Sequence, residues 1–299
     1  MPGPSGELPA GEEQRVKELI IEQYYNFVSS ADSLYRASNE AALQFQNLEN
    51  PLRVAASSVD YGLEALSAAT FFLGAATNSL LTLRLSSIGQ VTFSDGSTHV
   101  ERRITINGTA GLVRQALECA ARAHWLTSPA NPDELSRRGF AAIWADAYEA
   151  VRYARAIGSP ELSEKERGLA RLLEEGRARG LISENNGKPK PTTFLLSATD
   201  IIKKLRFTPG HVDGLRELLG SNVNCGEWVY RWLSGMAHGQ GWAHPRQATA
   251  IPEGSLGMHY TKPDWARLTL STSLAVRLIH TVLESLGRES PYVEIATRL

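Results

Sequence analysis

The chain has 299 residues, of which 42% are hydrophobic, and its 31 basic side chains nearly balance its 32 acidic ones. This length and apolar content suffice to bury a full hydrophobic core without disulfides or structural metals. The formal net charge of -1 excludes a global basic field that would hold nucleic acid non-specifically, so any nucleic-acid site must be local.

The N-terminal segment, residues 1–11, lacks the basic start and apolar stretch of a secretory signal, so we expect a disordered tail. The two cysteines, Cys119 and Cys225, lie in apolar helical patterns and indicate no disulfide framework. Together these features predict a cytoplasmic protein.

Residues 12–86 predict a pair of long antiparallel helices. Apolar side chains recur at helical spacing over residues 12–48, and Asn50-Pro51 is a typical helix start that opens a second helix. Residues 65–83 of that second helix are uncharged, close to membrane-spanning length. Their many Ser, Thr and Asn side chains favour a buried bundle helix, so we expect no membrane span.

A change of period marks residues 87–107 as a β-hairpin arm. Strand-like runs lie on both sides of Asp95-Gly96, a dipeptide typical of hairpin turns. Three charged residues, Glu101, Arg102 and Arg103, favour an exposed ribbon.

Residues 108–290 predict the main helical bundle. The expected helices cover residues 109–126, 131–157, 159–180, 197–205, 212–219, 224–238 and 264–287. The polar, Pro-containing stretch 183–193 is interpreted as a linker, and residues 291–299 as a tail. The fold class is therefore all-α, with about nine helices and one hairpin excursion near residues 90–106, in a single helical domain over residues 12–290.

The helix at residues 224–238 carries the main functional signal. At 3.6 residues per turn, Glu227, Arg231, Ser234 and His238 fall on one polar stripe opposite a broad apolar face. A guanidinium can hold phosphate oxygens, and an imidazole can take a proton from a ribose 2′-hydroxyl near neutral pH. The stripe predicts phosphodiester cleavage that needs no metal, with Ser234 adding a hydrogen bond and Glu227 orienting Arg231.

This segment resembles the signature of the HEPN superfamily, an arginine followed after four to six residues by a histidine. The superfamily comprises helical bundles, including metal-independent ribonucleases of toxin and defence systems, in which two protomers pair their motifs in one composite site. The resemblance implies that Arg231 binds phosphate and that His238 is the acid and base. It also implies RNA as the partner and a homodimer as the assembly.

Residues 112–126 and 230–243 are also similar to a bacterial family of helical proteins without an established function. Its members pair an Arg-x3-Glu helix with a Ser-x3-His-Gly helix, which here correspond to Arg114–Glu118 and Ser234–His238. If these residues face one another across a pocket, a small-molecule enzyme is a further hypothesis.

Two more residues support the candidate site. Tyr230 precedes Arg231, and Trp242 lies in a Gly-rich loop that can clamp a base by stacking.

A non-catalytic interpretation stays open beside these hypotheses. Glu227 and Arg231 would then be an ordinary surface pair, His238 a helix cap, and Arg114, Glu118 and Arg122 a structural ion-pair ladder. The protein would be a helical interaction or regulatory module. The sequence has no phosphate-binding loop or dinucleotide fingerprint, and its histidines lack metal-ligand spacing, so we expect neither cofactor nor metal.

Overall fold

The computed structural model describes residues 10–92, 97–102, 106–129, 131–185, 188–193, 201–202, 225–237 and 264–287. It confirms the all-α class with a β-hairpin excursion. The first helices and strands are α1 (Ala10–Ser29), α2 (Ala31–Gln46), α3 (Pro51–Ser57), α4 (Gly62–Ser87), β1 (Ile88–Thr92) and β2 (Thr98–Arg102). They are followed by α5 (Ile106–Thr127), α6 (Pro132–Ala156), α7 (Leu162–Ala178), β3 (Ile182–Asn185), β4 (Lys188–Pro191), α10 (Cys225–Ala237) and α11 (Trp265–Ser285).

The chain folds into two compact units. The described residues of unit 1 fall in Met1–Arg36, Ala75–Ala121 and Ala198–Ile279, and those of unit 2 in Ala37–Gly74, Arg122–Ser197 and His280–Leu299. Four helices, α2, α4, α5 and α11, contribute residues to both units. The expected single domain over residues 12–290 stays a prediction. The short helices expected at residues 197–205 and 212–219 lie almost wholly outside the described residues.

The single helix expected over residues 12–48 is wrong, because α1 and α2 are separate helices that meet at Ser30. The backbone bonding is nearly continuous, with Ser30 N donating to Asn26 O at 3.2 Å and Leu34 N to Ser30 O at 3.0 Å. The Ser30 hydroxyl donates to Phe27 O at 2.7 Å, and such local side-chain bonds compete with the regular helical pattern. Apolar periodicity continues across the break, which is why the sequence does not reveal it.

The core of unit 1 forms around Tyr24 of α1, whose side chain is fully buried. Its ring meets Tyr25 and Trp265 edge-on, at centroid distances of 5.2 Å and 5.6 Å. The Thr269 hydroxyl of α11 donates to Ile20 O of α1 at 3.1 Å. Burial raises the pKa of the Tyr24 phenol, so it stays neutral. Aromatic packing and one buried hydrogen bond thus join the first and last described helices.

α4 is, among the described helices, the one long and apolar enough to cross a membrane, judged by length and composition only. Several of its hydroxyl groups bond within the helix, as Ser79 does to Ala75 O at 2.9 Å and Thr82 to Asn78 O at 2.9 Å. The fully buried apolar side chains recur every three or four residues: Ala65, Ala69, Leu73, Ala76, Leu80 and Leu83. This is the pattern of a helix with one face inside a protein, and the absence of a span stays a prediction.

The first hairpin agrees with the sequence, because β1 and β2 pair antiparallel with Thr92 opposite Thr98. The turn expected at Asp95-Gly96 lies outside the described residues.

The linker expected at residues 183–193 is wrong, because β3 and β4 form a second antiparallel hairpin with Asn185 opposite Lys188. Proline lacks a backbone N–H and is tolerated in edge strands, and both strands of a two-stranded sheet are edges. Pro189 and Pro191 are therefore compatible with β4.

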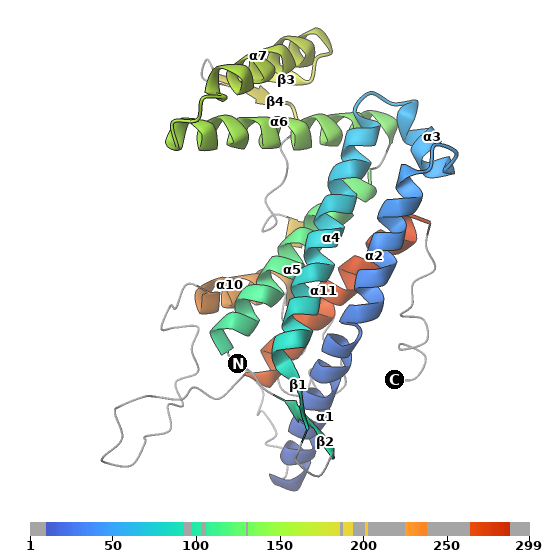
Figure 1. The fold of residues 1–299 in the computed structure, drawn as a ribbon, viewed down its shortest axis with the longest axis vertical. Helices are drawn as coiled ribbons and strands as arrows, with labels where there is room; N and C mark the ends of the chain where they lie inside the picture. Colours follow the sequence, from blue (N-terminus) through green and yellow to red (C-terminus); the bar gives the residue numbers. More distant parts are fainter. Residues whose placement is uncertain are drawn as a thin grey trace, which may run out of the picture. The chain divides into compact units, whose positions relative to one another are not determined.

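In unit 2, α7 lies along α6 and the β3–β4 hairpin lies beside both helices (Figure 1). The fully buried Phe140 of α6 is at the centre of this packing. Its ring lies 5.2 Å from the Tyr61 ring and 6.2 Å from the Trp144 ring, centroid to centroid. A Cβ atom on Gly176 of α7 would collide with the Phe140 ring. The two helices therefore pack closely because α7 has no side chain at this point.

A second close approach joins α6 to the turn before α4. Tyr61 adopts a φ of 58°, a left-handed conformation that is costly for a non-glycine residue. Its carbonyl oxygen lies so near Gly139 that a Cβ atom there would overlap it. A Cβ atom on Gly62 would likewise overlap the Ala56 carbonyl oxygen. The turn between α3 and α4 thus depends on two glycines.

Arg138 connects the end of α5 to the start of α6 within unit 2. Its buried guanidinium donates to the Trp125 carbonyl, lies 4.9 Å from the centroid of the Trp125 ring, and pairs with Glu134. The carbonyl is one of those that a helix end leaves without an intrahelical partner. Asn131 caps α6 by accepting from Glu134 N at 2.8 Å, which confirms the predicted start.

We predict that Gly139→Ala lowers the free energy of unfolding by about 2 kcal/mol or more, because the added methyl group meets a backbone carbonyl that cannot rotate away. Gly168→Ala is the control. Gly168 lies in α7, and no other group comes within 4 Å of the position that its Cβ would take, so alanine should stabilise by about 0.5–1 kcal/mol. Urea unfolding measures the free energy of unfolding of both variants. A Gly139→Ala value equal to that of the wild type would contradict the close contact between Gly139 and the Tyr61 carbonyl.

We predict that His280 makes the protein less stable in mild acid. This α11 side chain is buried, and burial lowers its pKa to about 4. The unfolded chain, with a His pKa near 6.5, binds the proton first, so stability falls as the pH drops from about 6.5 towards 4. Between pH 7 and 5 the loss should be about 2 kcal/mol.

His280→Gln, which does not titrate, should lack that part of the pH dependence. Urea unfolding at pH 7 and pH 5 checks this difference. If the wild type and the variant lose the same unfolding free energy between pH 7 and pH 5, His280 is not buried in its neutral form.

Candidate functional site

α10 has a buried side and an exposed side. Arg231 is exposed and Ser234 is half-buried. The opposite side is formed by the buried Val229, Trp232, Leu233 and Met236. The apolar face places α10 firmly, while Arg231 extends from its outer side.

A polar cluster connects α10 to α5 within unit 1. The Tyr230 hydroxyl donates to Glu118 Oε1 at 2.9 Å, and Arg114 Nε donates to the same oxygen at 2.8 Å. Arg114 Nη2 also lies 3.4 Å from the Tyr230 hydroxyl, and its guanidinium lies 5.5 Å from the centroid of the Tyr230 ring. One carboxylate oxygen thus accepts from two helices.

The cluster is about three-quarters buried, with 21% of the Arg114 side chain and 25% of the Glu118 side chain exposed. Burial alone would lower the pKa of Arg114. The hydrogen bond and charge of Glu118, together with the Tyr230 hydroxyl, outweigh burial and raise that pKa. Arg114 therefore stays cationic, and its charge is neutralised inside the cluster.

α11 supports α10 from another side. The Arg267 guanidinium lies 5.9 Å from the centroid of the Trp232 ring, and Arg267 pairs with Asp264 at 3.1 Å. Trp232 itself is buried. α10 is therefore held by α5 through Tyr230 and by α11 through Trp232 (the three helices lie together in Figure 1).

The structure brings together three predicted site residues, Arg114, Glu118 and Tyr230. Arg122, expected as the third member of an ion-pair ladder, instead places its guanidinium 5.5 Å from the centroid of the Phe72 ring. The ladder interpretation is therefore wrong at Arg122. The Glu118–Tyr230 bond joins positions 112 apart, and no local pattern signals such a contact.

The remaining candidate residues are not placed. His238 and Trp242 lie outside the described residues, as does the side chain of Glu227. The Glu227–Arg231 pair and the acid–base role of His238 stay predictions. Among the described residues no group of three His, Cys, Asp or Glu side chains is arranged to hold a metal ion.

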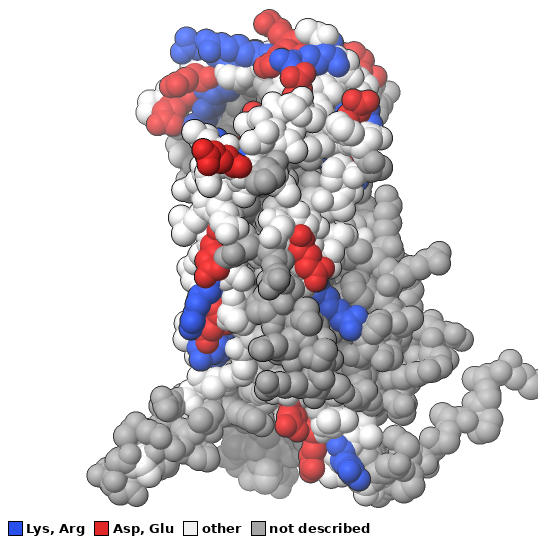
Figure 2. Space-filling model, turned by 90° about the vertical axis from the view of Figure 1, so that its right-hand side faces the viewer, with Lys and Arg blue, Asp and Glu red and all other residues white. Residues whose placement is uncertain are grey.

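The face drawn in Figure 2 carries charges of both signs. On this face most basic side chains lie next to acidic ones. Several are ion pairs, such as Arg84–Asp32 at 2.9 Å in unit 1.

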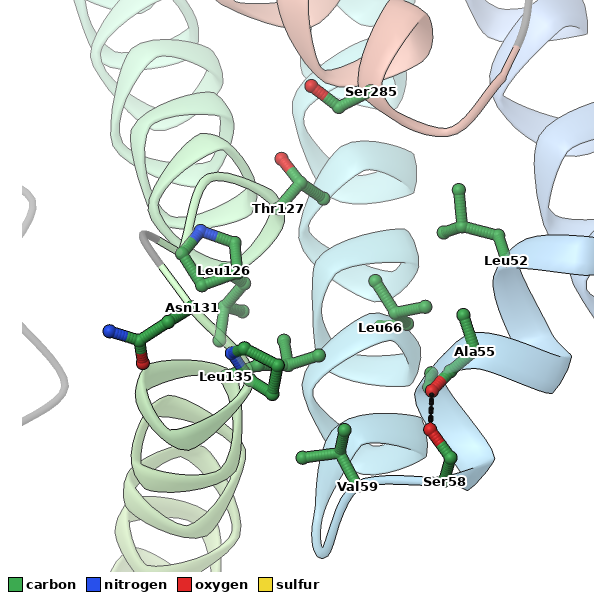
Figure 3. A pocket seen from close by; sticks show the side chains of 13 residues that line it. Leu52, Ala55, Ser58, Val59, Leu66, Leu126, Thr127, Asn131, Leu135 and Ser285 are labelled. Carbon is green, nitrogen blue, oxygen red and sulfur yellow. Dashed lines mark hydrogen bonds between the residues drawn. The ribbon is translucent and has the colours of Figure 1, made fainter.

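A cavity of about 480 Å³ lies in unit 2, and none of the residues of the Arg114–Glu118–Tyr230 cluster lines it. Leu66, Leu126 and Leu135 from α4, α5 and α6 surround it (Figure 3). Its Ser58 hydroxyl donates to Ala55 O at 2.7 Å, the bond drawn in Figure 3, and Thr127 likewise donates to Ala123 O at 3.1 Å. No charged residue lines this cavity within the described part of the chain.

Comparison with known proteins identifies no relative of this chain. No protein-family model matches it, and no significant match is found among curated proteins or solved structures.

We predict that Tyr230→Phe and Glu118→Gln each lower the free energy of unfolding by about 1–2 kcal/mol, because each weakens a half-buried hydrogen bond to a charged group. The double variant should lose less than the sum, with a coupling energy of about 1 kcal/mol. Urea unfolding of the four proteins measures this cycle. Tyr153→Phe, at a side chain with 67% exposure, is the control and should change little. If the loss in the Tyr230→Phe, Glu118→Gln double variant equals the sum of the two single losses, the two groups do not interact.

Proposed function

We propose that this protein is a HEPN-like ribonuclease that acts on RNA through α10 without a metal ion. The observation that supports this most is the exposure of Arg231 on a helix whose opposite side is buried. A guanidinium in that position is accessible to a phosphate group and is carried by a rigid element.

The chemistry assigns two roles. Arg231 binds the scissile phosphate and stabilises the charge that develops on its oxygens. His238 takes the proton of the ribose 2′-hydroxyl, which attacks the phosphorus, and a protonated imidazole gives a proton to the leaving 5′-oxygen. The products are a 2′,3′-cyclic phosphate and a 5′-hydroxyl end. In the proposed homodimer, two copies of the motif contribute to one site.

The polar cluster beside α10 supports a positioning role. Tyr230 directly precedes Arg231, and its bond to Glu118 opposes rotation of α10 about its own axis. The contact of Arg267 with Trp232 opposes the same motion from the α11 side. A fixed rotation matters because catalytic groups lose activity steeply when misplaced by about 1 Å.

A second candidate function is a small-molecule enzyme with a pocket around Arg114, Glu118, Ser234 and His238. The bonded, half-buried Arg114–Glu118–Tyr230 cluster favours it, because such networks are common beside active-site histidines. Cleavage of RNA that survives loss of the cluster would favour the first function. A helical interaction module remains if the protein neither cleaves RNA nor binds a small ligand at this cluster.

We predict that the purified protein cleaves RNA in the presence of EDTA, leaving 2′,3′-cyclic phosphate ends. His238→Ala and Arg231→Ala should each lower the cleavage rate by about 100-fold or more, because they remove the acid–base group and the phosphate ligand. Gel analysis of a labelled RNA measures the rate, and light scattering tests the homodimer.

Arg171→Ala is the matched control, since Arg171 is an exposed arginine of α7 in unit 2. It should cleave like the wild type, and circular dichroism should show the same fold for all variants. No cleavage by the wild type at any protein-to-RNA ratio would refute the proposal. Equal loss in Arg171→Ala would point to general charge instead of the α10 site.

A further inference from the structure

Unit 2 contains a second cavity, of about 690 Å³, lined by α6, α7 and β4. Its wall is mostly apolar: Trp144 and Val151 come from α6, Leu169 and Leu173 from α7, and Pro189 from β4. A volume of this size and an apolar lining are typical of sites for small organic ligands.

The wall of this cavity is supported from behind. The Trp144 ring lies 6.2 Å from the ring of the fully buried Phe140, centroid to centroid. Phe140 in turn occupies the space that a side chain at Gly176 would need. Because these contacts fix α7 against α6, the cavity exists before any ligand arrives and costs little to organise.

The charged residues of the lining leave an excess of positive charge. Glu149 pairs with Arg152 at 2.8 Å, and Glu166 pairs with Arg155 at 2.8 Å. Within the described part of the chain the Lys188 side chain has neither an ion pair nor a hydrogen bond, and no interaction of another kind is found for it. The acidic residues of the lining are thus neutralised, while Lys188 is not.

Lys190, two residues along β4, also lines the cavity and adds a second ammonium group at the same strand. The side chain of Lys188 is exposed and that of Lys190 is half-buried. An occupant that matches this lining therefore needs a hydrocarbon body and a negative group.

We propose that the cavity lined by α6, α7 and β4 binds a hydrophobic carboxylate, such as a fatty acid of medium length. Its chain lies between Trp144, Leu169 and Leu173, where it is removed from water. Its carboxylate meets the ammonium group of Lys188. A neutral alcohol of the same length loses that ion pair, and a cationic amphiphile is repelled. This site shares no residue with the proposed α10 site.

Isothermal titration calorimetry of the full chain with decanoate, 1-decanol and decyltrimethylammonium tests the site. We expect saturable, one-to-one binding of decanoate, with decanol at least about fivefold weaker and the cation weaker still. Lys188→Glu should weaken the binding of decanoate about tenfold and remove the preference for decanoate over decanol. Arg171→Glu reverses an exposed charge of α7 outside the lining and should leave binding unchanged.

Ala170→Trp tests the cavity itself. Ala170 is an exposed residue of α7 that lines the cavity, so an indole there fills it without entering the core. Binding of decanoate should be lost, while Arg171→Trp, one residue along, should bind like the wild type. Thermal unfolding confirms that both variants fold.

Three results would overturn the proposal. The first is no binding of decanoate by the wild type, and the second is equal affinity for decanoate and decanol. The third is binding by Ala170→Trp with unchanged affinity. None of these outcomes affects RNA cleavage at α10, so the two proposals fail independently.

Discussion

The bond between the Tyr230 hydroxyl and Glu118 is the constraint on which the proposed α10 site depends. Apolar packing sets which side of α10 is buried, but dispersion contacts have no strong direction of their own. A hydrogen bond of 2.9 Å to a carboxylate that is itself held by Arg114 has a direction. Together with the buried apolar face, it holds the rotation of α10 in which Arg231 is on the exposed side. The same network neutralises two charges that would otherwise be costly to bury.

Helix ends are the most predictable part of the fold, because their signals are local. Asn50 accepts from Leu52 N at 2.9 Å, as its position before Pro51 indicates. Gly180 follows α7 with a φ of 69°, a conformation that glycine adopts without strain. These residues determine their surroundings over a few positions, so the sequence alone suffices.

The segments where sequence and structure differ have physical reasons as well. The break at Ser30 changes only one turn and leaves the apolar period intact, so periodicity continues across it. The prolines of β4 favour a linker, although Asn186-Gly187, between the two strands, is a dipeptide typical of two-residue hairpin loops. Here the turn signal is the better guide than the proline content. The short helix α3 is also missed, because the start signal at Asn50-Pro51 belongs to it and not to α4.

For the candidate site, the sequence predicts which side of each helix is exposed, but not which side chains of different helices contact each other. Helical spacing correctly places Arg231 opposite the buried side of α10, because burial follows periodicity. The spacing of Arg114 and Glu118 likewise predicts their bond within α5. The choice of Tyr230 as the third member depends on how α5 and α10 pack, which is a long-range property. The same holds for Arg122, which lies over an aromatic ring instead of beside a carboxylate.

The contact between Gly139 and the Tyr61 carbonyl has a consequence for the geometry of unit 2. It fixes the position of α6 along its own axis. Shifting α6 by one residue in either direction would bring a side chain, that of Arg138 or Phe140, onto the carbonyl in place of a hydrogen atom. The helix therefore has one permitted setting, and that setting determines which of its side chains turn towards α7. The contact at Tyr61 thereby also sets which part of α6 faces α7, beginning with Phe140, the residue next to Gly139.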